Sequence, residues 1–289
     1  MVKKLNFSER YGYVDVTDVI QYEEMSSELR TALFNSVVIY ITIGFYDYDD
    51  EREVPQHTIR EVLYLPQYQK KLRKFFRSFY ANILKRKITE VPEYNNSAWE
   101  RFESYFNSAK WHEIYSLIEW FKQDIVDERQ EWQDAFQKRI NSDLEDCMAG
   151  YRLVEGLIVP ITDTNELAEV QTAVTVDKAE KHIKASLQCL HDKDFRNSVK
   201  ESISAVEAVA REKTGERTLG AALAKLESRN VIIPNILKQG FQKIYVWTCG
   251  EDGIRHAIMD EAQEITMAEA KFMLVACSVF INYLKMKGV

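Results

Sequence analysis

The sequence has few residues that break regular structure and few cysteines. Its 289 residues include only 10 Gly, 5 Pro and 4 Cys. So few Gly and Pro argue against a disordered chain, and widely spaced cysteines without a CxxC pair or a histidine at ligand spacing argue against a disulfide framework and a zinc site. We therefore expect buried thiols, no metal and no cofactor.

Long apolar runs and the common catalytic signatures are also lacking. No apolar run approaches the ~20 residues of a membrane span, and the start of the chain lacks the apolar stretch of a signal peptide. There is no Walker A motif, dinucleotide fingerprint, HExxH or nucleophile elbow. We therefore expect a cytoplasmic protein with no membrane contact. The sequence also lacks the motifs by which several large enzyme classes are usually recognised.

What is present is typical of compact helical proteins. Hydrophobic residues make up 46% of the chain and charged residues 29%, and the length is sufficient for two domains. The net charge is −7, with 21 basic and 30 acidic residues in 1–169 but 17 basic and 15 acidic residues in 170–289. The acidity therefore lies in the amino-terminal part, which argues mildly against unspecific polyanion binding by the whole surface.

The residue pattern predicts an all-α fold of two helical domains joined by a small β-hairpin. Residues 1–148 form the first domain, because apolar side chains recur at helical spacing near 27–45, 57–88, 97–110, 111–126 and 128–147. Residues 149–164 contain two β-prone runs around Glu155-Gly156 and form the hairpin. Residues 165–289 form a helical bundle of five helices, at about 177–190, 195–213, 218–228, 234–248 and 266–286.

Helix-capping residues set the expected starts of several bundle helices. Asp177 with Glu180 and Thr266 with Glu269 each have the spacing of a capping box, and Thr218 can cap a short helix. These expectations can be compared directly with the structure.

A turn rich in glycine and carboxylates precedes an Arg-His pair in the bundle. Arg255 and His256 suit reactions at phosphate, because a guanidinium holds phosphoryl oxygens and an imidazole titrates near neutrality. The common alternative is a solvated helix start in which Asp252 or Glu251 pairs with the basic residue.

Two further polar surfaces could contact RNA. Arg196, Lys200, Ser204 and Glu207 fall on one helical stripe, which is either part of a site or a salt-bridged surface. The segment from 62 to 89 has eight basic residues and no acid, interleaved with aromatic residues that could stack on bases, although such aromatics are more often core. Its basic residues are Lys70, Lys71, Arg73, Lys74, Arg77, Lys85, Arg86 and Lys87.

Several stretches resemble known abortive-infection proteins. Phe7-Ser-Glu-Arg-Tyr-Gly-Tyr13, Glu28-Leu-Arg30 and the 111–120 segment resemble the amino-terminal domain of AbiJ-type proteins. The stretches 196–207, 218–223, 251–257 and 270–278 resemble the HEPN domain that follows it in the same proteins.

This resemblance implies a sensor or regulatory domain followed by a dimerising HEPN bundle. HEPN ribonucleases cut RNA without metal and leave a 2′,3′-cyclic phosphate and a 5′-hydroxyl. By resemblance, Arg255 and His256 would be catalytic, supported by Asp252, Arg196, Lys200 and Glu207. The partners implied are RNA, a second copy of the chain and a phage-derived trigger or partner protein.

The arrangement of Arg255 and His256 differs from the common HEPN pattern, in which four to six residues separate Arg from His. Adjacent residues lie about 100° apart around a helix. A non-catalytic subunit that binds RNA, nucleotide or protein through the HEPN fold and the face formed by Lys70, Lys71, Lys74 and Arg77 therefore stays an alternative. A purely structural subunit of a larger complex is the third possibility.

Overall fold

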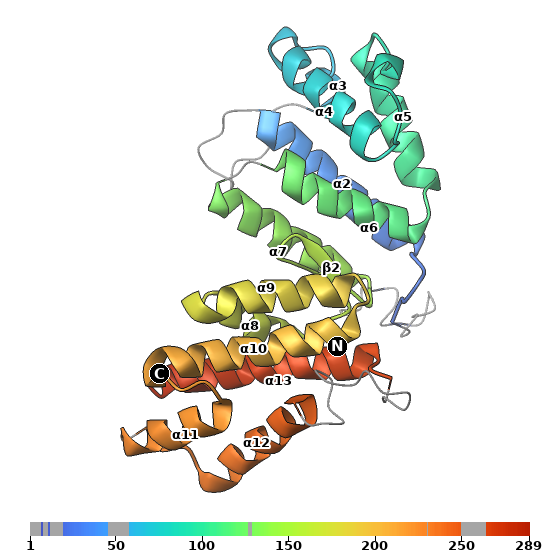
Figure 1. The fold of residues 1–289 in the computed structure, drawn as a ribbon. Coiled ribbons are helices and arrows are strands. Elements are labelled where there is room, and N and C mark those ends of the chain that lie inside the picture. The colour runs from blue at the N-terminus through green and yellow to red at the C-terminus, as the bar shows by residue number, and fades with distance from the viewer. Residues whose placement is uncertain are drawn as a thin grey trace. The chain divides into compact units, whose positions relative to one another are not determined.

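The computed structural model describes Phe7, Tyr11 and residues 20–45, 58–126, 129–229, 231–249 and 264–289. The chain divides into two compact units, Met1–Ile158 (unit 1) and Val159–Val289 (unit 2). Within the described residues both units are helical, and the sheet consists of two short strands (Figure 1). The prediction of an all-α, two-domain fold is confirmed.

Within the described residues, unit 1 is an array of helices (Figure 1). The predicted helix at 27–45 is confirmed, whereas the predicted single helix at 57–88 is wrong. Pro66 interrupts that segment, because a residue before proline, here Leu65, adopts an extended backbone. The helices are α2 (Ser27–Phe45), α3 (Ile59–Val62), η1 (Pro66–Tyr68), α4 (Gln69–Asn82), η2 (Ile88–Glu90), α5 (Asn95–Ser108), α6 (Trp111–Trp120), the π-helix η3 (Phe121–Ile125) and α7 (Gln130–Asp146).

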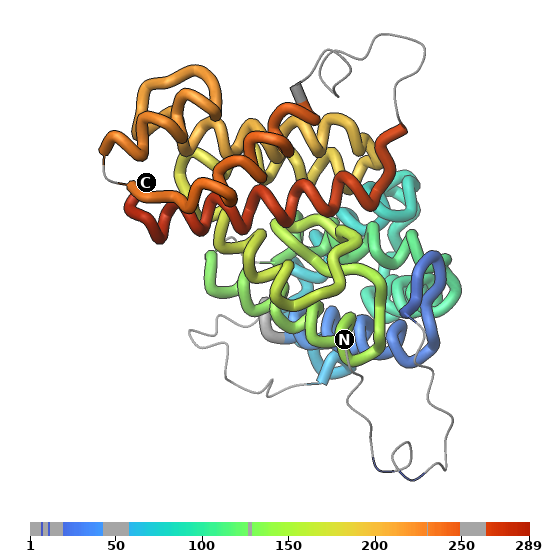
Figure 2. Tube along the Cα trace, turned by 90° about the horizontal axis from the view of Figure 1, so that it is seen from below, coloured from blue at the N-terminus to red at the C-terminus, as the bar shows by residue number. Residues whose placement is uncertain are grey.

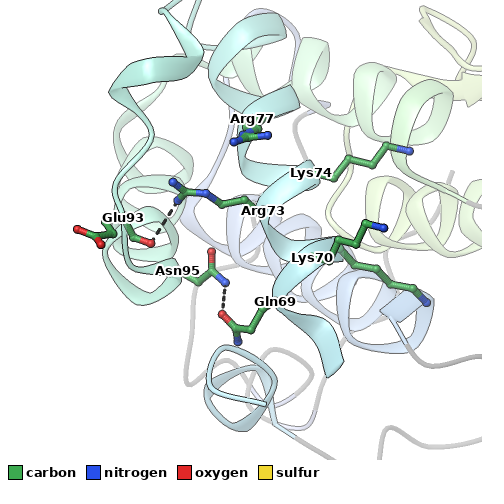
Figure 3. Close-up of a pocket in the computed structure, with 8 residues that line it drawn as sticks. Gln69, Lys70, Arg73, Lys74, Arg77, Glu93 and Asn95 are labelled. Atoms are coloured by element: carbon green, nitrogen blue, oxygen red, sulfur yellow. Dashed lines mark hydrogen bonds between the residues drawn. The ribbon is translucent and has the colours of Figure 1, made fainter. Parts of the chain in front are cut away.

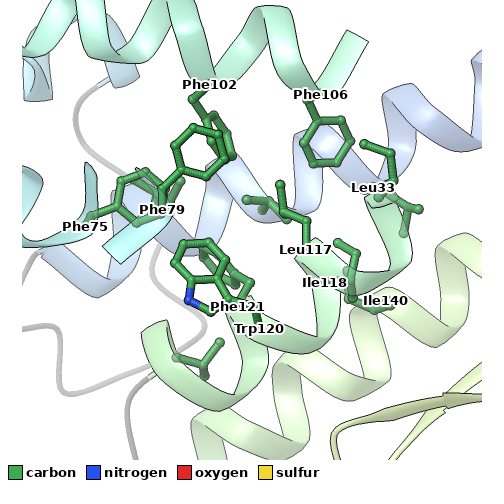
Figure 4. Close-up of a cluster of buried hydrophobic side chains, with 14 of the residues drawn as sticks. Leu33, Phe75, Phe79, Phe102, Phe106, Leu117, Ile118, Trp120, Phe121 and Ile140 are labelled. Carbon is green, nitrogen blue, oxygen red and sulfur yellow. The ribbon is translucent and has the colours of Figure 1, made fainter. Parts of the chain in front are cut away.

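Aromatic rings fill the core of unit 1. Figure 4 shows Phe75 and Phe79 of α4 facing Phe102 of α5, with ring centroids of the two α4 rings 5.4 Å and 5.1 Å from that of Phe102. Both pairs are edge to face, the arrangement that aromatic quadrupoles favour. Phe76 and Tyr80 are also buried. These four aromatic residues of the basic segment are therefore core residues.

The predicted hairpin is present as β1 (Arg152–Val154) and β2 (Leu157–Val159). Its two turn residues, Glu155 and Gly156, both have positive φ (50° and 83°), as a two-residue hairpin turn requires. Asn141 of α7 fixes the hairpin in unit 1, because its side-chain amide bonds both the N–H and the carbonyl of Leu153. The division between the two units falls after Ile158, inside β2.

The described part of unit 2 is a helical bundle that includes one helix the sequence analysis did not predict. The additional helix, α8, begins after Asp163, whose carboxylate accepts hydrogen bonds from the backbone N–H groups of Asn165 (2.8 Å) and Glu166 (3.1 Å). The helices are α8 (Thr164–Val174), α9 (Asp177–His191), α10 (Phe195–Thr214), α11 (Leu219–Ser228), α12 (Asn235–Cys249) and α13 (Met267–Met286).

Two of the three predicted helix caps are confirmed. Thr218 accepts from the Ala221 N–H, and Thr266 forms a capping box with Glu269. The box predicted at Asp177 is wrong, because Val176 is the N-cap of α9 and Asp177 pairs with Lys178 at 3.0 Å instead. An acid in a first helical turn is favoured by the helix dipole without capping it.

Helix α13 lies at the centre of unit 2. It packs against α8, α9 and α10, and both views show it alongside α10 (Figures 1 and 2). Among the described residues, α13 is the helix whose length and composition would allow it to cross a membrane, although a core helix passes the same test. Its buried Asn282 donates to the backbone and side-chain oxygens of Glu169 (3.0 and 2.6 Å), which fixes α13 to α8.

Candidate functional site

The predicted catalytic pair lies outside the described residues. Arg255, His256 and the supporting Asp252 belong to the segment 250–263, between α12 and α13. Their roles therefore stay predictions. The other predicted site residues lie on α10 of unit 2 and on α4 of unit 1.

On α10, the polar stripe and the apolar face are arranged as the sequence pattern indicates. Arg196 and Lys200 are exposed and Glu207 is half-buried. Val199, Ile203, Val206 and Val209 are buried on the other side of the helix. The stripe therefore faces outward in unit 2, and it presents cations at one end.

A histidine and a glutamate that the sequence analysis did not select lie beside this stripe. His182 Nδ1 of α9 is 2.7 Å from Glu201 Oε2 of α10, and Lys200 Nζ is 4.0 Å from Glu201 Oε1. A carboxylate bound at Nδ1 orients an imidazole. Glu201 contacts Nδ1 of His182 and not the other ring nitrogen, Nε2. Such a pair can transfer a proton at Nε2.

The register of α9 and α10 could have revealed this pair. The turn at Asp192 and Lys193 makes the two helices antiparallel neighbours, so residues equally distant from the turn face one another. Counting outward from the turn brings His182, ten residues before Asp192, near Glu201, eight residues after Lys193, and the structure pairs these two residues across 19 positions. A histidine search by sequence spacing alone misses a pair whose members belong to different helices.

The second group of predicted residues lines a cavity in unit 1. The volume of the cavity is about 880 Å³, and α4 forms much of its wall (Figure 3). The predicted Lys70, Lys71, Lys74 and Arg77 are all exposed. The lining residues are Gln69, Lys70, Lys71, Arg73, Lys74, Arg77, Glu93 and Asn95.

Arg73 is a structural member of this wall. Its Nη1 donates to the Pro92 carbonyl and, at 3.4 Å, to the Glu93 carbonyl, as Figure 3 shows for Glu93. These bonds fix the segment before α5 against α4. The shape of the cavity therefore depends on Arg73, whereas the exposed cations provide its charge.

Gln69 and Asn95 form a polar pair whose orientation is determined by the backbone. Gln69 Nε2 donates to the carbonyls of Leu63 (2.9 Å) and Leu65 (3.2 Å), so Gln69 Oε1 must face Asn95. Asn95 then presents Nδ2 to Gln69 Oε1, at 2.6 Å. Asn95 Oδ1 is left buried without a hydrogen-bond partner, although buried polar atoms normally have one.

The cavity presents exposed cations, but the aromatic residues of α4 are not available to stack on bases. Phe75, Phe76 and Phe79 are at most 2% exposed, so none of their ring faces is accessible to a base. The suggestion that these aromatics contribute to nucleic-acid binding is therefore wrong. They belong to the core that holds the basic face of α4 in position.

The fold and these surfaces define a helical two-unit protein with a cation-lined cavity in the first unit. A family model described as AbiJ N-terminal domain 4 matches residues 5–176, more than half of the chain, and the chain belongs to this family. The family connects the protein with abortive infection. No curated protein and no solved structure matches the chain. The matched region includes all of unit 1 from residue 5 and also α8 of unit 2.

Proposed function

We propose that the protein is a metal-independent endoribonuclease that acts in anti-phage abortive infection. Family membership supports the defence role, and the resemblance of residues 165–289 to HEPN domains supports the cleavage of RNA. The structural observation that carries the proposal is the grouping of the His182–Glu201 pair with Lys200 and Arg196 on the outward side of α10. Unit 1 would sense a trigger and restrain unit 2.

The proposed reaction is the attack of a ribose 2′-oxygen on the adjacent phosphorus. A base removes the 2′ proton, the new O–P bond closes the cyclic phosphate, and the bond to the 5′-oxygen breaks as that oxygen gains a proton. Arg255 would stabilise the charge on the phosphoryl oxygens, and His256 would carry a proton at the 2′- or 5′-oxygen. Asp252 would orient one of them, Arg196 or Lys200 would hold RNA, and Glu207 would support the same surface.

The proposal is tested by incubating the full chain with RNA in EDTA and separating the products. Cleavage should yield cyclic-phosphate ends, and His256→Ala should reduce the rate by about 10²–10⁴-fold, the usual contribution of an acid–base residue. His112→Ala, at an exposed position in unit 1, serves as the matched histidine control. Equal cleavage by His256→Ala and wild type would remove His256 from the mechanism.

The variant His182→Ala tests whether His182, and not His256, is the histidine that transfers the proton. If this variant folds and loses cleavage while His256→Ala retains it, His182 is the proton carrier. Glu201→Gln keeps the shape of the side chain and removes its charge, so it should then lower activity and shift the pH profile. An effect of His182→Ala on thermal stability alone would make the pair structural.

A non-catalytic binding module is the alternative, and the basic face of α4 favours it. Lys70, Lys74 and Arg77 recur at helical spacing on an exposed surface that could contact phosphates. This function predicts RNA binding that weakens steeply with salt, without cleavage under any condition. A charge-reversed face, for example Lys74→Glu with Arg77→Glu, should then abolish binding.

We also propose that unit 2 mediates homodimer formation. Helix α12 presents Ile236, Leu237, Val246 and Trp247 to solvent, at 78%, 39%, 62% and 36% exposure. Such a group of apolar side chains on one helix is typical of an interface. Ile236→Glu with Val246→Glu should turn a dimer into a monomer in light scattering, whereas Tyr64→Glu in unit 1 should not.

A further inference from the structure

The cavity beside α4 combines features that RNA cleavage by unit 2 does not use. We infer that it binds a phosphorylated ligand that also carries an O–H or N–H donor, as a mononucleotide or the terminal nucleotide of an RNA strand does. The site lies entirely in unit 1. The inference therefore stands or fails independently of the ribonuclease proposal.

The cations of the cavity are available to a phosphate. Lys70, Lys74 and Arg77 recur at positions i, i+4 and i+7 of α4, which places them on one helical face. They are exposed, and no other described residue forms an ion pair with them. Glu93 is the one acid among the lining residues, against five bases. The lining is therefore strongly positive within an acidic amino-terminal part.

Asn95 distinguishes this cavity from a simple anion site. Its Oδ1 is buried and has no partner, and the fixed orientation of Gln69 prevents the amide from turning to offer Nδ2 in its place. A fully ionised phosphate monoester group has only acceptor oxygens and cannot satisfy Asn95 Oδ1. A sugar hydroxyl or a base amino group can donate to it.

The size of the cavity and the surrounding charge favour a small ligand. A volume of about 880 Å³ is within the ~300–1,000 Å³ range of small-molecule sites. Residues 1–169 carry 30 acidic and 21 basic residues, and this net negative charge of the amino-terminal part disfavours a long polyanion. One nucleotide is enough to place a phosphoryl group on the cations and a donor at Asn95.

Calorimetric titration of the full chain tests the inference. The ligands are adenosine 5′-monophosphate, sulfate as a tetrahedral dianion without a donor, and an RNA pentanucleotide with and without a 5′-phosphate. We expect the monophosphate to bind at least about tenfold more tightly than sulfate, because only the nucleotide can donate to Asn95. Binding of the pentanucleotide only when it is 5′-phosphorylated identifies a strand terminus as a second source of the same chemistry.

Matched variants place the binding in this cavity. Lys74→Gln and Arg77→Gln should each weaken nucleotide binding about tenfold, since each removes a charge-assisted contact. Glu93→Gln should strengthen it by removing the one acid. Lys87→Gln removes an exposed lysine outside the cavity and should leave the affinity unchanged.

Three results would overturn the inference. The first is no binding of either the monophosphate or the phosphorylated pentanucleotide below ~1 mM, the limit of weak specific affinity. The second is binding of sulfate as tightly as the nucleotide, which removes the role of Asn95. The third is wild-type affinity in both Lys74→Gln and Arg77→Gln. None of these measurements depends on RNA cleavage.

Discussion

The cores of the two units are filled with different kinds of side chains. In unit 1, rings from α4, α5, α6 and η3 contact one another, as Figure 4 shows. Among the described residues of unit 2, Phe280 is the one buried aromatic, and most of the core consists of aliphatic residues, alanine and serine. Ser186, Ser198 and Ser202 are completely buried between α9 and α10.

This difference determines which change each unit tolerates. Large rings connect helices across wide gaps, so removing a ring from unit 1 leaves a cavity that its neighbours fill only partly. Small residues allow α9 and α10 to approach closely, so unit 2 has little space for additional atoms. Unit 1 should therefore be sensitive to truncation and unit 2 to enlargement.

The largest effect is expected for Phe102→Ala. The Phe102 ring lies within 6.4 Å, centroid to centroid, of the rings of Phe34, Phe75, Phe79, Trp99 and Phe106. Its loss should lower the unfolding free energy of unit 1 by about 3–5 kcal/mol. Urea unfolding followed by tryptophan fluorescence reports mainly on unit 1, because four of the five tryptophans (Trp99, Trp111, Trp120 and Trp132) belong to it.

Tyr64→Ala is the control for this prediction, since Tyr64 is 70% exposed. It should change the unfolding free energy by no more than about 0.5 kcal/mol. A similar cost for both substitutions would mean that the aromatic cluster is not what stabilises unit 1.

A smaller loss of stability is expected for Ser186→Val, which enlarges a buried side chain instead of truncating one. Ser186 Oγ donates to the Ser198 carbonyl at 2.9 Å and lies 2.8 Å from Ser202 Oγ. Valine adds volume and removes the hydroxyl, which should cost unit 2 about 1–3 kcal/mol. The far-ultraviolet circular dichroism melt should show a lower transition, and Ser228→Val at an exposed helix end should not. A neutral Ser186→Val would show that α9 and α10 are loosely packed.

The smallest effect concerns Lys122 in the π-helix of unit 1. Lys122 is 7% exposed, its Nζ donates to the Gln133 carbonyl at 2.9 Å, and burial lowers its pKa, partly opposed by Glu155 and Asp134. Between this lowered pKa and the ordinary value of 10.5, the unfolded chain binds more protons than the folded chain. Stability contributed by Lys122 should therefore rise with pH in that window.

The measurement compares wild type with Lys122→Met by urea unfolding between pH 7 and 10. The difference in unfolding free energy should grow with pH by at most about 1.4 kcal/mol per unit, the limit for one proton. Lys138→Met, at an exposed position, should show no such trend. If the difference in unfolding free energy between wild type and Lys122→Met does not change with pH, the lowered pKa of Lys122 is contradicted.

Much of the fold follows from local signals in the sequence. The all-α class, the hairpin at Glu155-Gly156 and the caps at Thr218 and Thr266 were predicted, because each depends on a few neighbouring residues. The break at Pro66 carries an equally local signal that the helical periodicity of the segment obscured. Helix α8 was missed because its polar residues and threonines give a weak apolar pattern, while its buried face depends on packing against α13.

The candidate sites required long-range information. Sequence spacing selected the cations of α4, but the role of Asn95 depends on a hydrogen bond between residues 26 positions apart. The His182–Glu201 pair depends on the register of two helices. The aromatics near the cations looked suitable for stacking, and only their burial shows that they form the core.

The position of α8 limits where the family region of this chain can be joined to the helical bundle of another protein. The family region ends at residue 176, yet α8 folds on unit 2, where Glu166 pairs with Lys271 at 2.8 Å and Glu169 accepts from Asn282. In a chimera joined at residue 176, α8 of one protein would have to pack against the helical bundle of another. Successful natural or engineered chimeras should therefore either retain partners for Glu166 and Glu169 or place the junction near residue 159, so that α8 travels with its own bundle.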